Sequence, residues 1–134
     1  MDLLIIALGF AVSGYTAFSF YKAGEFKLKS SKETMLAAGF GWLEKQPVGV
    51  AKTIGLLEIL GAAGLILAPV GYLLGFEWAI WFAVAAGAGL ALTMVGAILV
   101  HAQRGELKYT LKMNLRPLAV AAVSAGAWAV LPLI

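Results

Sequence analysis

The sequence predicts an all-α fold, an integral membrane four-helix bundle with a short interfacial helix in the first cytoplasmic loop. The first observation is composition, because 62% of the 134 residues are hydrophobic and only 13% are charged. Soluble domains are roughly 45–50% apolar and about 25% charged, and a chain of this size has too little interior to hide the excess. The other two observations are four long apolar windows and the distribution of basic residues between them.

Each apolar window is long enough to cross a membrane as a helix, since about 20 residues span a ~30 Å hydrocarbon core. Helices are expected because a strand edge in lipid would leave backbone groups unsatisfied. Only Asp2 is charged before the first window, and a signal peptide has a basic start and a shorter apolar run. We therefore expect the first window to be a helix of the mature protein. The expected spans are residues 3–21, 48–68, 78–100 and 115–131, in one transmembrane domain covering 1–134.

The basic residues predict the orientation of the bundle. Residues 69–77, between the second and third windows, contain no Lys or Arg. Because Lys and Arg mark cytoplasmic loops, we expect loops 22–47 and 101–114 to be cytoplasmic and both termini to lie outside. The net charge of +3 is then no sign of nucleic-acid binding, because the basic residues border the membrane. These residues are Lys22, Lys27, Lys29, Lys32 and Lys45 in the first loop, and Arg104, Lys108, Lys112 and Arg116 in and after the third.

Two loop segments carry helix-start signals. Ser30-Ser31-Lys32-Glu33 offers a Ser-x-x-Glu capping box and precedes an apolar stretch, which predicts a short helix lying at the membrane surface. The alternative is an ordinary connector whose Trp42 belongs to an aromatic belt. Before the fourth window, Asn114 is the expected N-cap, with Pro117 in the first turn of the helix.

Small residues at helical spacing predict where the helices pack. Lipid is as apolar as Leu, so membrane helices associate through close contact of small side chains, and residues three or four apart share one face. The expected packing faces are Gly9–Ser13–Ala17, Gly55–Glu58–Gly61/Ala62, Gly89–Thr93–Gly96/Ala97 and Ala122–Gly126.

Polar residues on these faces lie at similar distances from the cytoplasmic end of each window, roughly 10–15 Å inside. We therefore expect Ser13, Thr93 and Ser124 to form a polar layer around Glu58 near the midplane, approached by Tyr15 and Thr16. An acidic side chain within a span should face the interior and be paired or neutral. Glu58 is a candidate proton carrier or donor to a ligand oxygen such as a quinone carbonyl. The alternative is helix–helix association through hydrogen bonds.

Other charged residues offer further candidates near the cytoplasmic surface. His101, at the end of the third window, is a candidate proton donor at a ligand entrance, or an interfacial residue that interacts with the helix dipole. Lys52 either extends to the interface or forms, with Lys22, a cationic gate for an anionic or polarised head group. The chain contains no cysteine and one histidine, so we expect no thiolate chemistry, metal site or haem within it.

Two segments are informative together, Gly55-Leu-Leu-Glu58-Ile-Leu-Gly61-Ala-Ala-Gly64 and Met94-Val-Gly-Ala-Ile-Leu-Val-His101-Ala-Gln-Arg104-Gly105-Glu106. With Lys22 and Ala38-Gly39-Phe40, they resemble the DoxX-like membrane proteins. The resemblance implies a small four-helix protein of the bacterial inner membrane, most of whose relatives have no assigned activity. The family name comes from a thiosulfate:quinone oxidoreductase subunit. Some relatives are linked to redox or oxidative-stress complexes, and a vertebrate branch assists receptor assembly. Glu58, His101 and Arg104 match the recurring polar positions of the family.

Three functions are consistent with these features. The first is a non-catalytic subunit that binds a quinone or isoprenoid-type lipid, scaffolds a membrane redox complex, or both. The second is an assembly chaperone or structural interaction protein, and the third is a lipid-modifying enzyme with Glu58 as proton carrier. An enzyme is least favoured because no second acid or base is expected at the depth of Glu58. Expected partners are the bilayer and a membrane protein or further copies of the chain, with no nucleic acid.

Overall fold

The protein is described here by a computed structural model that covers residues 3–134, and throughout that part of the chain the regular structure is helical. Asp2, which entered the argument about the first span, lies outside the described residues. Three single turns of 3-10 helix, η1 (Gly41–Leu43), η2 (Glu77–Ala79) and η3 (Leu131–Leu133), occupy connections and the C-terminal end. The α-helices are α1 (Leu3–Lys29), α2 (Lys32–Ala37), α3 (Val48–Leu73), α4 (Ile80–Gln103) and α5 (Leu107–Val130).

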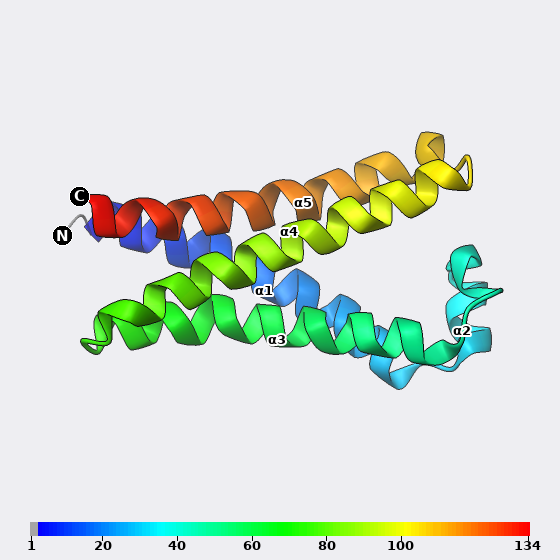
Figure 1. Ribbon diagram of the computed structural model, residues 1–134, viewed down its shortest axis with the longest axis horizontal. Coiled ribbons are helices and arrows are strands. Elements are labelled where there is room, and N and C mark those ends of the chain that lie inside the picture. The colour runs from blue at the N-terminus through cyan, green and yellow to red at the C-terminus, as the bar shows by residue number, and fades with distance from the viewer. Residues whose placement is uncertain (1–2) are drawn as a thin grey trace.

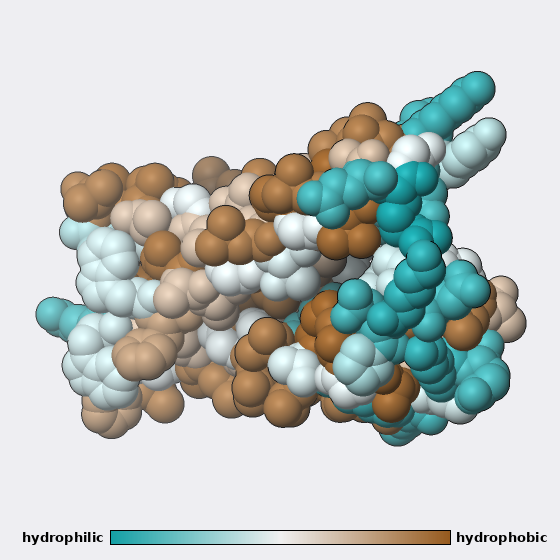
Figure 2. Space-filling view, turned by 45° about the vertical axis from the view of Figure 1, so that its right-hand side comes forward, coloured by the Kyte–Doolittle hydropathy of each residue, from teal (hydrophilic) through white to brown (hydrophobic). Residues whose placement is uncertain are grey.

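Four of these helices are long and apolar enough to cross a membrane, which confirms the predicted fold class. Only 22–33% of the most apolar window of each one is buried within the protein. The remaining apolar side chains face outward, where a lipid environment removes them from water. Figure 2 shows the same division, with hydrophobic residues over most of the visible surface and hydrophilic residues gathered at one end. The chain is a multi-pass membrane protein.

The long helices pack as two antiparallel pairs, α1 with α3 and α4 with α5. The pairs meet closely at the end that holds the C-terminus and diverge toward the end that holds α2 (Figure 1). We call the diverging end, which carries residues 22–47 and the α4–α5 turn, the basic end. The opposite end, with the start of α1 and the α3–α4 connection, we call the terminal end.

The first helix is longer than predicted. The sequence analysis ended the span at Tyr21, but α1 continues for two further turns to Lys29. Glu25 stabilises the exposed side of this extension through two ion pairs. Its carboxylate oxygens lie 3.6 Å from the nitrogen of Lys22, one turn before it, and 2.6 Å from the nitrogen of Lys29, one turn after it. Charged pairs at this spacing support helix where hydropathy gives no signal.

The fourth long helix begins eight residues earlier than the predicted span. Gly105, with φ of +70°, makes the tight turn that ends α4, and Glu106 is the residue before α5. The carbonyl of Glu106 accepts the backbone N–H of Thr110 at 3.2 Å and its hydroxyl at 3.0 Å. Asn114 is therefore not an N-cap but a buried residue two turns into the helix, and Pro117 lies inside α5 rather than in its first turn.

A short helix is present in the first loop, as predicted, although its cap differs. Ser31, not Ser30, is the N-cap of α2, and its hydroxyl oxygen accepts the backbone N–H of Thr34 at 3.1 Å. The α2–η1 segment packs onto the start of α3 through Met35, Leu43 and Ala51, all fully buried. The first loop therefore has a defined fold and packs against the basic end of the bundle.

Glycines allow the closest helix contacts within each pair. A Cβ on Gly24 of α1 would lie 2.5 Å from the carbonyl oxygen of Gly55 of α3, and a Cβ on Gly87 of α4 would lie 2.9 Å from the Ala125 backbone of α5. The predicted packing faces of α1 and α3 are correct. Those of α4 and α5 are wrong, because the residues that face outward there are Gly89, Gly96, Ala122 and Gly126. Small residues occur on every face of those two helices, so their spacing did not single out the inner one.

Candidate functional site

The predicted polar layer divides into two groups at different levels. The first, which we call the midplane group, links α1 to α5. The Trp128 indole N–H donates to the Ser13 hydroxyl at 2.8 Å, and the hydroxyls of Thr16 and Ser124 lie 3.1 Å apart. All four side chains are fully buried or nearly so. Thr16 and Ser124 are each also within 2.8 Å of a carbonyl one turn back in their own helices. This geometry is that of interhelical hydrogen bonding.

Glu58 belongs to the second group, at the basic end, where Lys27 is its partner. The Lys27 ammonium donates to both carboxylate oxygens, at 2.8 and 3.1 Å. The side chains are 12% and 2% exposed, respectively. Sequence reasoning missed Lys27 because it ended the first span at Tyr21. Helical spacing is the signal that could have identified it. Lys27 follows the buried residues Phe20 and Gly24 at intervals of three or four residues, which places it on the same inner face of α1.

The ion pair leaves one N–H of Lys27 without a hydrogen-bond partner among residues 3–134. An ammonium has three N–H donors, and Glu58 takes two of them. The Phe40 ring lies 5.7 Å from the Lys27 nitrogen and covers it from the α2–η1 segment. A buried ion pair is favourable only when its remaining donors and acceptors are also satisfied, so this pair is a place where a further acceptor could bind.

Three residues of the α4–α5 turn form a second charged cluster at the basic end. His101 Nδ1 donates to Glu106 Oε2 at 2.7 Å, and Arg104 Nε donates to Glu106 Oε1, also at 2.7 Å. The His101 hydrogen bond first, and the Arg104 hydrogen bond second, hold the pKa of the Glu106 carboxyl below its usual range. His101 is buried, and it contacts Glu106 rather than Glu58.

The α2–η1 segment of the α1/α3 side touches the turn of the α4/α5 side. A Cβ on Gly41 would lie 2.8 Å from Arg104 Nη2. Figure 2 shows hydrophilic residues gathered at this end of the molecule. The second charged cluster and the α2–η1 segment are therefore neighbours.

Asn114 is a further polar residue of the basic end. It is 7% exposed, and no hydrogen-bond partner within residues 3–134 reaches its side-chain nitrogen Nδ2. It lies on the same face of α5 as the buried residues Ala121, Ser124 and Trp128. This face is the one that packs against α1 in the midplane group. Asn114 is predicted as an N-cap only if the helix begins after it, whereas α5 begins at Leu107.

The structure does not bring the remaining predicted site residues into either group. Lys52 donates to the carbonyls of Leu28 and Ser30, each at 2.7 Å, so it caps the C-terminus of α1 instead of gating a ligand. Lys22 is exposed beside Glu25. Tyr15 is half exposed on the outside of α1, whereas Thr93 donates at 3.0 Å to the carbonyl one turn back in α4.

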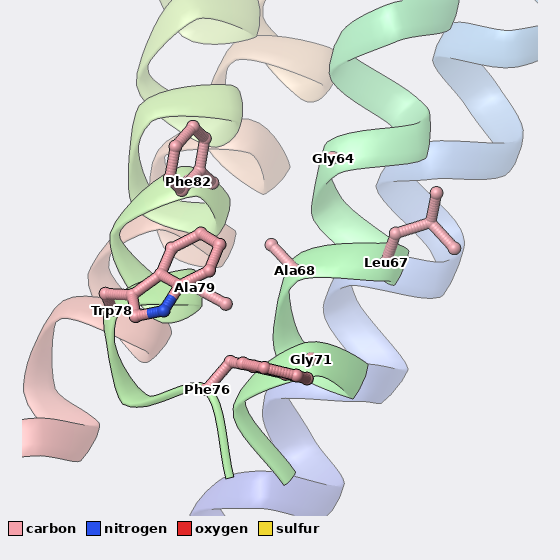
Figure 3. A pocket seen from close by; sticks show the side chains of 8 residues that line it. All are labelled: Gly64, Leu67, Ala68, Gly71, Phe76, Trp78, Ala79 and Phe82. Atoms are coloured by element: carbon pink, nitrogen blue, oxygen red, sulfur yellow. The ribbon is translucent and has the colours of Figure 1, made fainter. Parts of the chain in front are cut away.

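A separate apolar groove opens at the terminal end. It has a volume of about 570 Å³ and lies between α3 and the start of α4. Figure 3 shows Leu67 and Ala68 on the α3 side and Trp78 and Phe82 on the other. The groove has no charged lining residue, so it offers shape and apolar contact without a polar anchor. Its lining consists of Gly64, Leu67, Ala68, Gly71, Phe76, Trp78, Ala79 and Phe82.

Comparison with known proteins identifies the family. The family model described as the DoxX-like family matches residues 11–127, which include all four long helices apart from their outermost ends. No curated protein and no solved structure matches the chain. The family match agrees with the resemblance found in the helix motifs, and it includes both polar groups described above except Trp128, one residue beyond its end. The chain therefore belongs to the DoxX-like family.

Proposed function

We propose that the protein is a small non-catalytic membrane subunit that binds a lipid-soluble molecule of the quinone or isoprenoid type at the basic end. The observation that carries this proposal is the Lys27–Glu58 ion pair, which is buried at the basic end and leaves one Lys27 N–H without a hydrogen-bond partner among residues 3–134. A quinone carbonyl or prenol hydroxyl oxygen is the kind of acceptor that this donor would take.

The placement of the polar groups favours binding over mere helix association. The midplane group already links α1 to α5 with uncharged side chains. A charged pair in a membrane helix costs free energy that uncharged residues would avoid, which is why such pairs mark functional sites. The α1–α3 contact is moreover made by Gly24 and Gly55 directly, so the ion pair is not needed to join these helices.

The pairing of the charges argues against acid–base catalysis. Lys27 engages both oxygens of Glu58, and Glu106 engages both His101 and Arg104. A general acid or base must reach a reacting proton directly or through one water, and Lys27 engages both oxygens of Glu58, the candidate proton carrier. A lipid-modifying enzyme that uses Glu58 as proton carrier is therefore the less favoured proposal. We also infer a bacterial inner membrane location, with the basic end of the bundle on the cytoplasmic side, from the basic residues at that end.

A second candidate function is that of an interaction or assembly protein for a redox complex or another membrane partner. One observation favours it. Gly89 and Gly96 on α4 and Gly126 on α5 face outward rather than into the bundle. Outward small residues allow another membrane helix to approach closely, so a partner protein or a second copy of the chain would fit there.

The test is native mass spectrometry of the protein extracted gently from its own membrane. We expect the wild type to retain a quinone or isoprenoid lipid and the double variant Lys27→Met/Glu58→Leu to lose it. The double variant removes both charges together and so avoids leaving one buried ion unpaired. Lys22→Met, which changes an exposed lysine on the same helix, serves as the matched control. Equal retention by the wild type and the double variant would contradict the proposal, and a stoichiometric protein without lipid would favour the second function.

A further inference from the structure

Three basic residues of α5 have no partner within the part of the chain that the structure describes. Lys108, Lys112 and Arg116 are exposed, and neither an ion pair nor a hydrogen bond joins their side chains to another of residues 3–134. The carboxylate nearest in sequence is that of Glu106, and both of its oxygens are already bonded within the α4–α5 turn. The start of α5 therefore carries a positive charge that the described residues do not balance.

The other side of the basic end treats its lysines differently. Most lysines of α1, α2 and α3 are bonded to a carboxylate or to backbone carbonyls, namely Lys22, Lys27, Lys29, Lys32 and Lys52. Lys45, exposed in the turn before α3, stands alone there. The start of α5 lies away from α2, across the basic end (Figure 1). Three unpaired cations on one helix thus distinguish α5 from the α1/α3 side.

The three cations share one face of α5, which we call the basic stripe. They are spaced four residues apart, so they lie above one another within about 12 Å of helix. The buried residues of α5, such as Ala121, Ser124 and Trp128, lie on the opposite face at 100° per residue. The basic stripe therefore points away from the bundle and toward the surrounding lipid.

The same face continues as an apolar surface. Residues 117–134 contain no charged side chain and span about 27 Å as a helix, close to the ~30 Å hydrocarbon core. Ala119, Val123 and Val130 follow the basic stripe on its own face and are exposed. Arg116 therefore lies at the boundary between the head groups and the acyl chains, where lipid phosphates are found.

We propose that this face of α5 binds an anionic phospholipid. The phosphate contacts Lys112 and Arg116, whereas the acyl chains lie along Ala119 and Val123. Arginine offers a fork of N–H donors that fits phosphate oxygens, and lysine adds a point charge. Basic residues beside a membrane helix attract anionic lipids in this way. The apolar continuation favours a molecule with an anionic head and apolar chains over an acidic soluble segment.

The site is distinct from the Lys27–Glu58 ion pair and does not depend on the proposed function. The Lys27 side chain is buried between α1 and α3, whereas the basic stripe is exposed on the outside of α5. The lipid that it binds is a charged membrane component, and a quinone or isoprenoid lipid is not. Failure of one proposal therefore leaves the other standing.

The variants separate a local site from general attraction of positive charge to the membrane. Lys112→Gln/Arg116→Gln removes two exposed charges from the basic stripe. Lys22→Gln/Lys45→Gln removes two exposed charges from the α1/α3 side of the same end and serves as the matched control. Lys112→Arg/Arg116→Lys keeps both charges and shows whether charge, rather than side-chain shape, is needed.

The experiment measures the apparent Kd of phosphatidylglycerol by native mass spectrometry of the delipidated protein in detergent micelles. We expect Lys112→Gln/Arg116→Gln to raise the Kd about thirtyfold, from a factor of about five for each basic residue removed. The control variant and the charge-retaining variant should bind as the wild type does. Wild-type binding should weaken as NaCl is added, because salt screens exposed charges.

Four results would overturn the inference. The first is wild-type affinity in Lys112→Gln/Arg116→Gln, and the second is equal weakening in Lys22→Gln/Lys45→Gln. The third result needs no variant, and it is equal affinity of the wild type for phosphatidylglycerol and for phosphatidylcholine, whose head group has no net charge. The fourth is displacement of the lipid by inorganic phosphate beyond the effect of NaCl at equal ionic strength, which would indicate a site for free phosphate instead.

Discussion

The midplane group and the basic end arrange their polar side chains in opposite ways. Around Ser13 and Trp128 the helix pairs are close, and the polar groups are uncharged and bonded to each other. At the basic end the pairs diverge (Figure 1), most polar contacts are ion pairs, and one N–H of Lys27 and the Nδ2 of Asn114 have no hydrogen-bond partner among residues 3–134. The difference teaches that unused hydrogen-bonding capacity, rather than polarity or depth, separates a candidate binding site from helix association.

The largest expected effect is that of leaving one buried charge without its partner. Glu58→Leu leaves the Lys27 ammonium unpaired and should lower the free energy of unfolding by about 3 kcal/mol. Lys27→Met/Glu58→Leu should restore most of that loss because no charge is left buried. Reversible unfolding in mixed micelles, followed by circular dichroism, measures both. If the single and double variants are equally unstable, the ion pair does not form as described.

The next largest effect is expected from a substitution at the contact between α1 and α3. Gly24→Ala would place a Cβ 2.5 Å from the Gly55 carbonyl oxygen, a backbone atom that cannot move without shifting α3. Overpacking of this kind typically costs about 1–3 kcal/mol. The matched control is Gly14→Ala, where no atom lies within 4 Å of the added carbon. The same unfolding assay should show a lower free energy of unfolding for Gly24→Ala only. Equal stability of the two variants would contradict the close α1–α3 contact.

A smaller effect is expected in the midplane group. Thr16→Val removes a hydroxyl that lies 3.1 Å from Ser124 while keeping the side-chain shape. Hydrogen bonds between membrane helices contribute about 0.6 kcal/mol on average, so the loss of stability should be of that order. Retention of the bound lipid in native mass spectrometry should not change. Loss of the lipid in Thr16→Val would place the midplane group in the binding site and remove the distinction between the two regions.

The smallest effect is a pH dependence at the α4–α5 turn. Because the folded protein holds the pKa of Glu106 below its ordinary value of 4.5, the contribution of this carboxylate to stability is complete above that value. It is lost as the pH falls through the lowered pKa. The stability difference between the wild type and Glu106→Gln should therefore shrink as the pH drops below 4.5. Unfolding midpoints measured from pH 7 to pH 3 test this, and a difference that grows on acidification would be the wrong sign.

The fold followed from the sequence because hydropathy acts over whole helices. Four apolar windows and the basic loops between them were enough to predict four membrane helices. Helix ends were less predictable, since α1 continues through Lys22–Lys29 by charge pairing and α5 begins at a turn made by Gly105. Neither signal appears in a hydropathy window.

The site was predictable only in part, and for a related reason. Glu58 and His101 stood out because charged or titratable residues are rare in such helices, but their partners Lys27 and Glu106 lay in segments assigned to loops. With α1 ended at Tyr21, Lys27 had no place on an inner helix face. Asn114 was likewise interpreted as a cap, because seven residues of α5 before it were left outside the helix.

The measurement that tests the central claim most directly compares ligand retention in two double variants, one from each region. Native mass spectrometry of protein taken from its own membrane would be applied to Lys27→Met/Glu58→Leu and to Ser13→Ala/Trp128→Phe. The second pair removes the midplane hydrogen bond between α1 and α5. The account predicts that the midplane variant retains the lipid-soluble ligand of the wild type and that the basic-end variant loses it. Loss in the midplane variant with retention in the basic-end variant would contradict the account.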